Sequence, residues 1–212
     1  MGSVPQKPIS PRPFSMIRSY ALPDLFTMGN AASGTAVVFL CLSYLSRGNP
    51  GSIWAAFGLI PLALVCDGFD GWIARKRNRA SMIGADMDSL ADIVSFGVAP
   101  AVLGYTLGLN GAWDVVVLVV FVVCGISRLA RYNATAADMA DDAGKVTHYQ
   151  GTPIPTSCLI VVMLTVAFAR GAVGPQIWWG AVELGPWTLH PLVVIYLVSG
   201  SLMVSTLKIP KI

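Results

Sequence analysis

Residues 67–92 read DGFDGWIARKRNRASMIGADMDSLAD and place five carboxylates on the two sides of a short basic segment. Asp67 and Asp70 share one helical face because they are three positions apart, and Asp88 and Asp92, four apart, share another. A short loop between the two helices makes them antiparallel neighbours, so these faces can meet. Four carboxylates then converge near one end of a helical bundle, whereas Asp86 lies off this face.

The residues around the carboxylates indicate what they bind. A charged Asp within a membrane costs about 2.5–3.5 kcal/mol, and all-oxygen ligand sets suit Mg²⁺, Mn²⁺ or Ca²⁺. Gly71, Ala74 and Gly84 on the same faces leave space for a bulky ligand, and Arg75 can bind phosphate through two parallel N–H groups. Taken singly, each aspartate could be a helix cap. Together, in a chain with only eleven acidic residues, they predict a metal site that holds a pyrophosphate.

The remainder of the chain is typical of a polytopic membrane protein. Its 212 residues are 55% apolar and 12% charged, with a mean hydropathy of +0.67, whereas soluble domains carry about 25% charged residues. Apolar stretches near the length of a membrane span predict an all-α bundle of six transmembrane helices, over 25–46, 53–75, 82–107, 113–132, 153–169 and 187–207. These helices are expected to form one domain, 25–212. Residues 1–24 are expected to be a proline-rich tail that ends in a short interfacial helix or a linker.

The distribution of lysine and arginine predicts the orientation in the membrane. With six spans, twelve of the fourteen basic residues fall on one side, and Arg47 and Arg170 fall on the other. Because basic residues remain on the cytoplasmic side, both termini and the acidic site should face the cytoplasm. Trp178, Trp179 and Trp187 on the other side are expected to be interfacial anchors. His148 and His190 are expected to have no catalytic partner.

The stretch from Asp67 to Asp92 resembles the signature of the CDP-alcohol phosphotransferase family, D-x2-D-G-x2-A-R-x8-G-x3-D-x3-D, at all eight fixed positions. The resemblance implies a six-helix homodimer that binds two divalent ions, Mg²⁺ or Mn²⁺. It also implies roles for the residues that match: metal ligands Asp67, Asp70 and Asp88; a general base that can also contact a metal, Asp92; and a CDP-lipid pocket lined by Asp67, Gly71, Ala74, Arg75 and Gly84.

Three further segments resemble the phosphatidylserine synthase branch of this family. They are DSLADIVSFGVAP at 88–100, RLARYN at 128–133 and GTPIP at 151–155, of which the last is most similar to fungal members. This resemblance implies CDP-diacylglycerol as the donor and L-serine as the acceptor. It also implies the endoplasmic reticulum as the location if the source is eukaryotic, and otherwise the plasma membrane.

The chemistry of serine suggests where its pocket lies. Its carboxylate needs a cation near the reactive hydroxyl, and Arg128 and Arg131 lie at the same end of the fourth span as the acidic site. We favour Arg131, with Tyr132 beside it, although both arginines could instead be membrane anchors. Ser95 and Phe96, about one turn past Asp92, are further candidates, and core packing explains Phe96 equally well.

Two polar residues of the first span, Thr27 and Asn30, point to the same end of the bundle. They are candidate donors to the CDP-lipid, and helix capping is the competing interpretation.

Two alternative functions stay open from the sequence. One is the same chemistry with another acceptor, such as glycerol 3-phosphate or an inositol phosphate, although a phosphate-bearing acceptor calls for a more basic pocket. The other is a divalent-cation transporter that uses the aspartates as a filter. Membrane lipid is an expected partner and nucleic acid is not.

Overall fold

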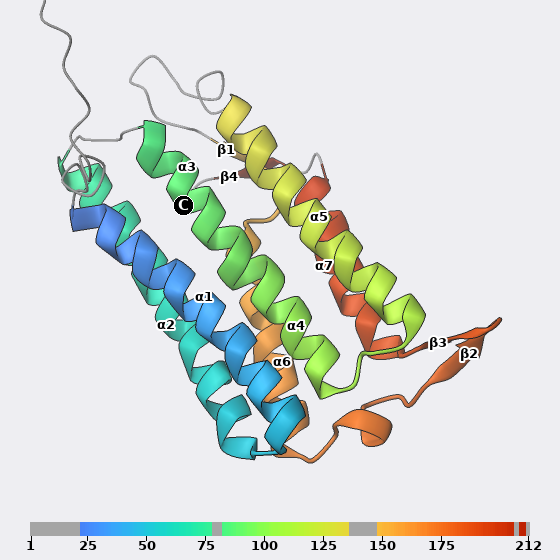
Figure 1. Cartoon of the computed structure of the whole chain (residues 1–212). Coiled ribbons are helices and arrows are strands. Elements are labelled where there is room, and N and C mark those ends of the chain that lie inside the picture. Colours follow the sequence, from blue (N-terminus) through green and yellow to red (C-terminus); the bar gives the residue numbers. More distant parts are fainter. Residues whose placement is uncertain (1–21, 78–81, 136–147, 206–207, 211–212) are drawn as a thin grey trace, which may run out of the picture.

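The first two helices form an antiparallel pair. The computed structural model describes residues 22–77, 82–135, 148–205 and 208–210, so the interfacial helix expected within 1–24 lies almost wholly outside the described residues. α1 (Leu22–Arg47) and α2 (Pro50–Arg77) pack along each other (Figure 1). Gly48 between them has φ 65°, a backbone conformation that favours glycine.

The third span is a composite helix in the middle of the bundle. α3 (Met82–Asp92), the π-helix η2 (Ile93–Val98) and α4 (Ala99–Leu107) follow one another without a break. Of the four longest apolar helices, this one is the most buried, because α1, α5 (Ala112–Thr135) and α6 (Cys158–Ala169) all pack against it. Single π-helical turns inside longer helices are frequent near functional sites, and η2 begins immediately after Asp92.

Short elements complete the chain. In order they are β1 (His148–Gln150), η3 (Ile154–Ser157), α6 (Cys158–Ala169), η4 (Gly174–Gln176), β2 (Val182–Leu184), β3 (Trp187–Leu189), η5 (Pro191–Val193), α7 (Val194–Val204) and β4 (Lys208–Pro210). β1 pairs with β4 at the end of the bundle where α3 begins, and the β2–β3 hairpin projects from the opposite end (Figure 1).

The all-α class predicted from the sequence is confirmed, and the number of spans is confirmed in part. Four helices are long and apolar enough to cross a membrane, and Ile154–Ala169 and Pro191–Val204 are shorter apolar helices of 10–17 residues. The last predicted segment, 187–207, begins too early. Its first residues form β3, because Gly185 with φ 66° allows the chain to reverse between β2 and β3.

The outside of the bundle is apolar, and some polar side chains lie within its largely apolar core. Phe39, Leu159 and Val162 expose 66%, 74% and 60% of their surface, as expected for helices that face lipid. In contrast, Asn30 and Asp92 are buried. Polar groups turned into the bundle interior of a membrane protein mark functional sites or structural pairs.

One such structural pair lies at the hairpin end of the bundle. Asp114 at the start of α5 is fully buried. It accepts hydrogen bonds from the backbone N–H of Gly111 at 2.9 Å and of His190 at 2.8 Å, and lies 2.5 Å from the His190 ring nitrogen Nδ1. His190 therefore has a structural partner, which joins the start of α5 to the segment that precedes α7.

Replacing Asp114 with alanine is expected to destabilise the bundle. The change leaves the part-buried donor of Gly111 and the buried donors of His190 without an acceptor, which costs about 3 kcal/mol in total. Thermal unfolding in detergent should show a Tm several degrees lower. The matched control is Asp86→Ala, because Asp86 is exposed; equal Tm values for the two variants would contradict the structural role of Asp114.

Candidate metal and acceptor site

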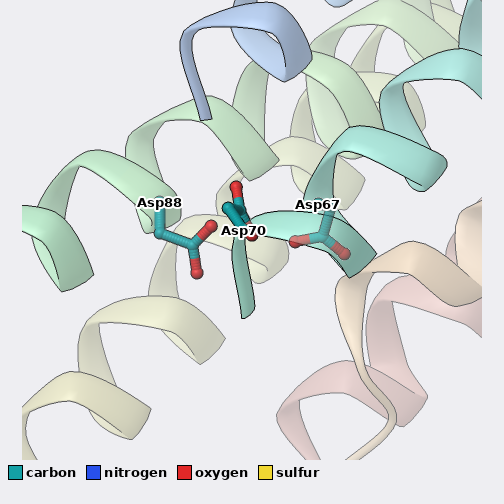
Figure 2. A group of neighbouring side chains, drawn as sticks. All are labelled: Asp67, Asp70 and Asp88. Atoms are coloured by element: carbon teal, nitrogen blue, oxygen red, sulfur yellow. The ribbon is translucent and has the colours of Figure 1, made fainter. Parts of the chain in front are cut away.

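Three carboxylates meet at the end of the bundle where α2 ends and α3 begins. Asp67 and Asp70 lie on α2 and Asp88 on α3, and ligand oxygens of the three lie within 4.8 Å of one another. Figure 2 shows the three side chains turned towards a common space. The helical spacings read from the sequence therefore bring these residues together as expected, because α2 and α3 run antiparallel.

Asp92 lies next to this cluster, one helical turn beyond Asp88. Its side chain is 8% exposed, and its carboxyl group is within hydrogen-bonding reach of that of Asp67. It also accepts a hydrogen bond from Asn30 at 3.0 Å. The fourth carboxylate is therefore in contact with the cluster and is held by α1 as well.

The donor set fits a divalent cation. Carboxylates at this separation repel one another in a poorly solvated interior, and a hard cation with oxygen ligands removes that repulsion. The Oδ1 atom of Asp88 is buried without a hydrogen-bond partner among the described residues, so it has a lone pair available for such an ion. Oxygen-only ligands of this kind suit Mg²⁺ or Mn²⁺.

A cavity of about 300 Å³ adjoins the carboxylates. Its lining residues come from α3, α5 and the segment before α6, and they are Ala85, Asp88, Ser89, Asp92, Arg128, Leu129, Tyr132, Asn133, Pro153 and Pro155. A volume of this size can hold a small polar molecule. Two carboxylates of the acidic site, Asp88 and Asp92, thus form one wall of the cavity, and a buried arginine forms another.

The arginine in this wall is Arg128. It is 8% exposed, and its guanidinium carbon lies 5.6 Å from the centre of the Tyr132 ring, in the range of a cation–π contact. Arg131, which we favoured from the sequence, is not among the lining residues. Its Nη2 atom donates to the carbonyl oxygen of Val204 at 3.5 Å. The two arginines are about one helical turn apart, so their spacing in the sequence could not show which of them lines the cavity.

Two further candidates for the acceptor pocket, Ser95 and Phe96, lie elsewhere. Both are fully buried, and neither lines the cavity. Ser95 donates from Oγ to the carbonyl oxygen of Asn30 at 2.8 Å, and Phe96 belongs to the apolar core. Ser89 and Asn133, which were not predicted from the sequence, are bonded to each other at 3.0 Å in the cavity wall. Ser89 directly follows Asp88, and Asn133 is the last residue of the RLARYN segment. These positions were the signal in the sequence that could have indicated them as cavity residues.

The structure describes the side chains of only some of the residues expected to bind the CDP-lipid. Gly71 in α2 and Gly84 in α3 are half-buried on the two helices that carry the cluster. Ala74 and Arg75 belong to the last turn of α2, and their side chains lie outside the described part of the chain. Thr27 and Asn30 do not cap α1; their side chains bond to aspartates of the site.

The fold and the site together define a protein of long apolar helices with a cluster of carboxylates at one end of its bundle. Residues 20–198 match the model of one family along most of the chain. The chain belongs to the CDP-alcohol phosphatidyltransferase family.

Several curated relatives are similar to this chain. The CDP-diacylglycerol–serine O-phosphatidyltransferase of Saccharomyces cerevisiae is 38% identical over 202 residues, which are 93% of this chain and 73% of that protein. The archaetidylserine synthase of Methanothermobacter thermautotrophicus is 39% identical over 66% of this chain and 56% of its own length. The CDP-diacylglycerol–serine O-phosphatidyltransferase of Helicobacter pylori is 34% identical over 68% and 56%. The matched region thus spans only about half of the two prokaryotic proteins.

Proposed function

We propose that this protein is a phosphatidylserine synthase, which transfers the phosphatidyl group of CDP-diacylglycerol to the hydroxyl of L-serine and releases CMP. Family membership supports the donor, and the printed activities of the relatives from Saccharomyces and Helicobacter support the acceptor. The observation that carries the proposal is that Asp88 of the acidic cluster and the buried Arg128 line the same cavity.

The carboxylates of Asp67, Asp70 and Asp88 would hold two divalent ions, Mg²⁺ or Mn²⁺. When bound, such ions polarise the pyrophosphate of the donor and stabilise the negative charge on the departing CMP. The half-buried Gly71 and Gly84 leave room for the nucleotide beside the cluster, and Ala74 and Arg75 follow on the same end of α2.

The residues of the cavity would bind and activate serine. Arg128, held against Tyr132, forms charge-assisted hydrogen bonds with the serine carboxylate. Asp92 removes the proton of the serine hydroxyl, whose oxygen forms a bond to the phosphorus that carries diacylglycerol. The bond from this phosphorus to the CMP oxygen breaks, and the electron pair leaves with CMP.

The two alternatives make different predictions. A phosphorylated acceptor such as glycerol 3-phosphate carries two negative charges, and the cavity has a single lining arginine among the described residues. A divalent-cation transporter would carry ions without CDP-lipid. It does not account for the match of residues 20–198 to a family of phosphatidyltransferases.

The acceptor can be identified with purified protein, CDP-diacylglycerol and Mn²⁺. We expect CMP release with serine to exceed that with inositol by at least about tenfold, because uncharged inositol cannot form the charge-assisted hydrogen bonds with Arg128, which contribute about 1.5–3 kcal/mol. Release with glycerol 3-phosphate should also be lower, because the second negative charge of its phosphate finds no second arginine in the cavity lining among the described residues. Release with glycerol 3-phosphate alone would overturn serine as the acceptor. Mn²⁺ flux into vesicles without CDP-lipid would favour a transporter.

The membrane arrangement is also part of the proposal. All six helices would span the bilayer, with the two shorter ones completed by the segments that precede and follow them. Both termini and the site would face the cytoplasm, in the endoplasmic reticulum of a eukaryote or otherwise in the plasma membrane, as the distribution of basic residues supports. The family resemblance supports a homodimer, which chemical cross-linking in native membranes can test.

A further inference from the structure

A row of polar residues on α1 makes contacts to which the proposed reaction assigns no role. Thr27, Asn30 and Ser33 recur every three residues on this apolar helix, and all three are buried, at 5%, 0% and 7% exposure. Among the residues that the structure describes, Ser33 bonds only to its own helix, to the carbonyl oxygen of Gly29 at 2.8 Å. The other two reach across to neighbouring helices.

Thr27 and Asn30 each bond to one aspartate of the site. Oγ1 of Thr27 donates to Oδ2 of Asp70 at 2.9 Å, and Nδ2 of Asn30 donates to Oδ1 of Asp92 at 3.0 Å. Both contacts are buried, and they connect residues 43 and 62 positions apart. Each aspartate thus has one oxygen held by α1.

Asn30 is held by its backbone as well as by its side chain. Its carbonyl oxygen accepts the hydrogen bond of Ser95 in η2 at 2.8 Å. One helical turn further along α1, Gly34 lies so close to η2 that a Cβ atom there would come within 2.7 Å of the Cα of Ser95. Because α1 and η2 are in direct backbone contact, Asn30 has little freedom to turn away from Asp92.

The two aspartates differ in their surroundings. Asp70 belongs to the three-carboxylate cluster, whereas Asp92 lines the cavity and is also within reach of Asp67. A carboxylate in the position of Asp92 can act either as a further metal ligand or as a base. A fixed N–H donor on Oδ1 makes this oxygen a poorer metal ligand and leaves Oδ2 for the acceptor.

We propose that α1 positions the two functions of the site separately: Asn30 holds Asp92 as the base that faces the acceptor, and Thr27 orients Asp70 as a metal ligand. Both are positioning residues, and neither binds the nucleotide as the sequence had suggested. This inference rests on the proposed function, because it assigns Asp92 and Asp70 the roles given there.

The test compares Thr27→Val with Asn30→Leu, which keep the approximate size of each side chain, and uses Ser33→Ala on the same helical face as the control. Loss of a group that orients a metal ligand typically lowers metal affinity about 10- to 100-fold. We expect Thr27→Val to weaken Mn²⁺ binding, measured by electron paramagnetic resonance without substrate, by this factor. Asn30→Leu should lower kcat about 10- to 100-fold and change Mn²⁺ affinity and the KM for serine less than twofold. Ser33→Ala should match the unaltered protein.

A double variant separates positioning from general damage to the fold. If Asn30 acts through Asp92, Asn30→Leu should lower kcat little further in an Asp92→Asn background, because groups that act as a unit are not additive. Independent, multiplicative losses would overturn the proposal. Asn30→Ser, which is too short to reach Asp92, replaces the leucine variant if that protein does not fold.

Other outcomes are equally decisive. A large loss of CDP-diacylglycerol affinity in Asn30→Leu with unchanged kcat would make Asn30 a nucleotide ligand, and parallel losses of Mn²⁺ affinity in both variants would place Asp92 among the ligands. If the unaltered protein releases CMP only with another acceptor, the variants are compared with that acceptor. In that case serine as the acceptor is wrong, and the positioning roles of Thr27 and Asn30 are still tested. If it turns over with none, the proposed function and this inference both fail.

Discussion

Replacing Asp92 with asparagine is expected to lower kcat by about 10²- to 10⁴-fold, because this is the usual contribution of a general base. Asparagine has nearly the same shape, and its carbonyl oxygen can still accept the hydrogen bond of Asn30, so the loss reports the missing basicity. The affinity for CDP-diacylglycerol should change little, since Asp92 lies outside the cluster of Asp67, Asp70 and Asp88. Turnover by rapid quench and donor binding by calorimetry measure the two quantities.

Asp86→Asn is the matched control for this variant. Asp86 lies on the same helix, is exposed, and falls outside both the cluster and the lining of the cavity. It should retain the kcat of the unaltered protein. A normal kcat for Asp92→Asn would show that another group removes the proton, whereas lost donor binding would move Asp92 from the acceptor side to the metal site.

Replacing Arg128 with leucine is expected to raise the KM for serine about 10- to 100-fold. Hydrogen bonds to a charged partner contribute about 1.5–3 kcal/mol, and Arg128 is the buried cation that lines the cavity. The Kd for CDP-diacylglycerol should be nearly unchanged. Arg128→Lys should recover only part of the loss, because an ammonium group lacks the planar pair of N–H donors and the stacking on Tyr132.

Arg131→Leu is the variant to compare with Arg128→Leu, because the sequence could not decide which of the two arginines binds serine. Arg131 bonds to the carbonyl oxygen of Val204 at the end of α7, so its replacement should affect stability more than serine binding. Steady-state kinetics over a wide range of serine concentrations measure the difference. If Arg131→Leu raises the KM for serine more than Arg128→Leu does, the pocket assignment is wrong and the original preference for Arg131 is restored.

The acidic cluster and the membrane class were determined by the sequence alone, because both depend on local regularities. Spacings of three and four residues place carboxylates on one face of any α-helix, and a short loop makes consecutive helices antiparallel. Asp67 and Asp70 on one helix and Asp88 on the next therefore lie at the same end of the bundle, where α1 packs against both helices. Long apolar stretches likewise imply a membrane span in any arrangement of the helices.

Only the tertiary structure decided the partners of Thr27 and Asn30, the choice between Arg128 and Arg131, and the start of the last apolar helix after a hairpin. Helical periodicity tells which residues share a face, but the rotation and depth of each helix follow from side-chain packing against its neighbours. Gly34 against Ser95 sets that packing for α1, and it brings Asn30 to Asp92 across 62 positions. Such long-range contacts depend on the whole bundle, so no pattern within a single helix could reveal them.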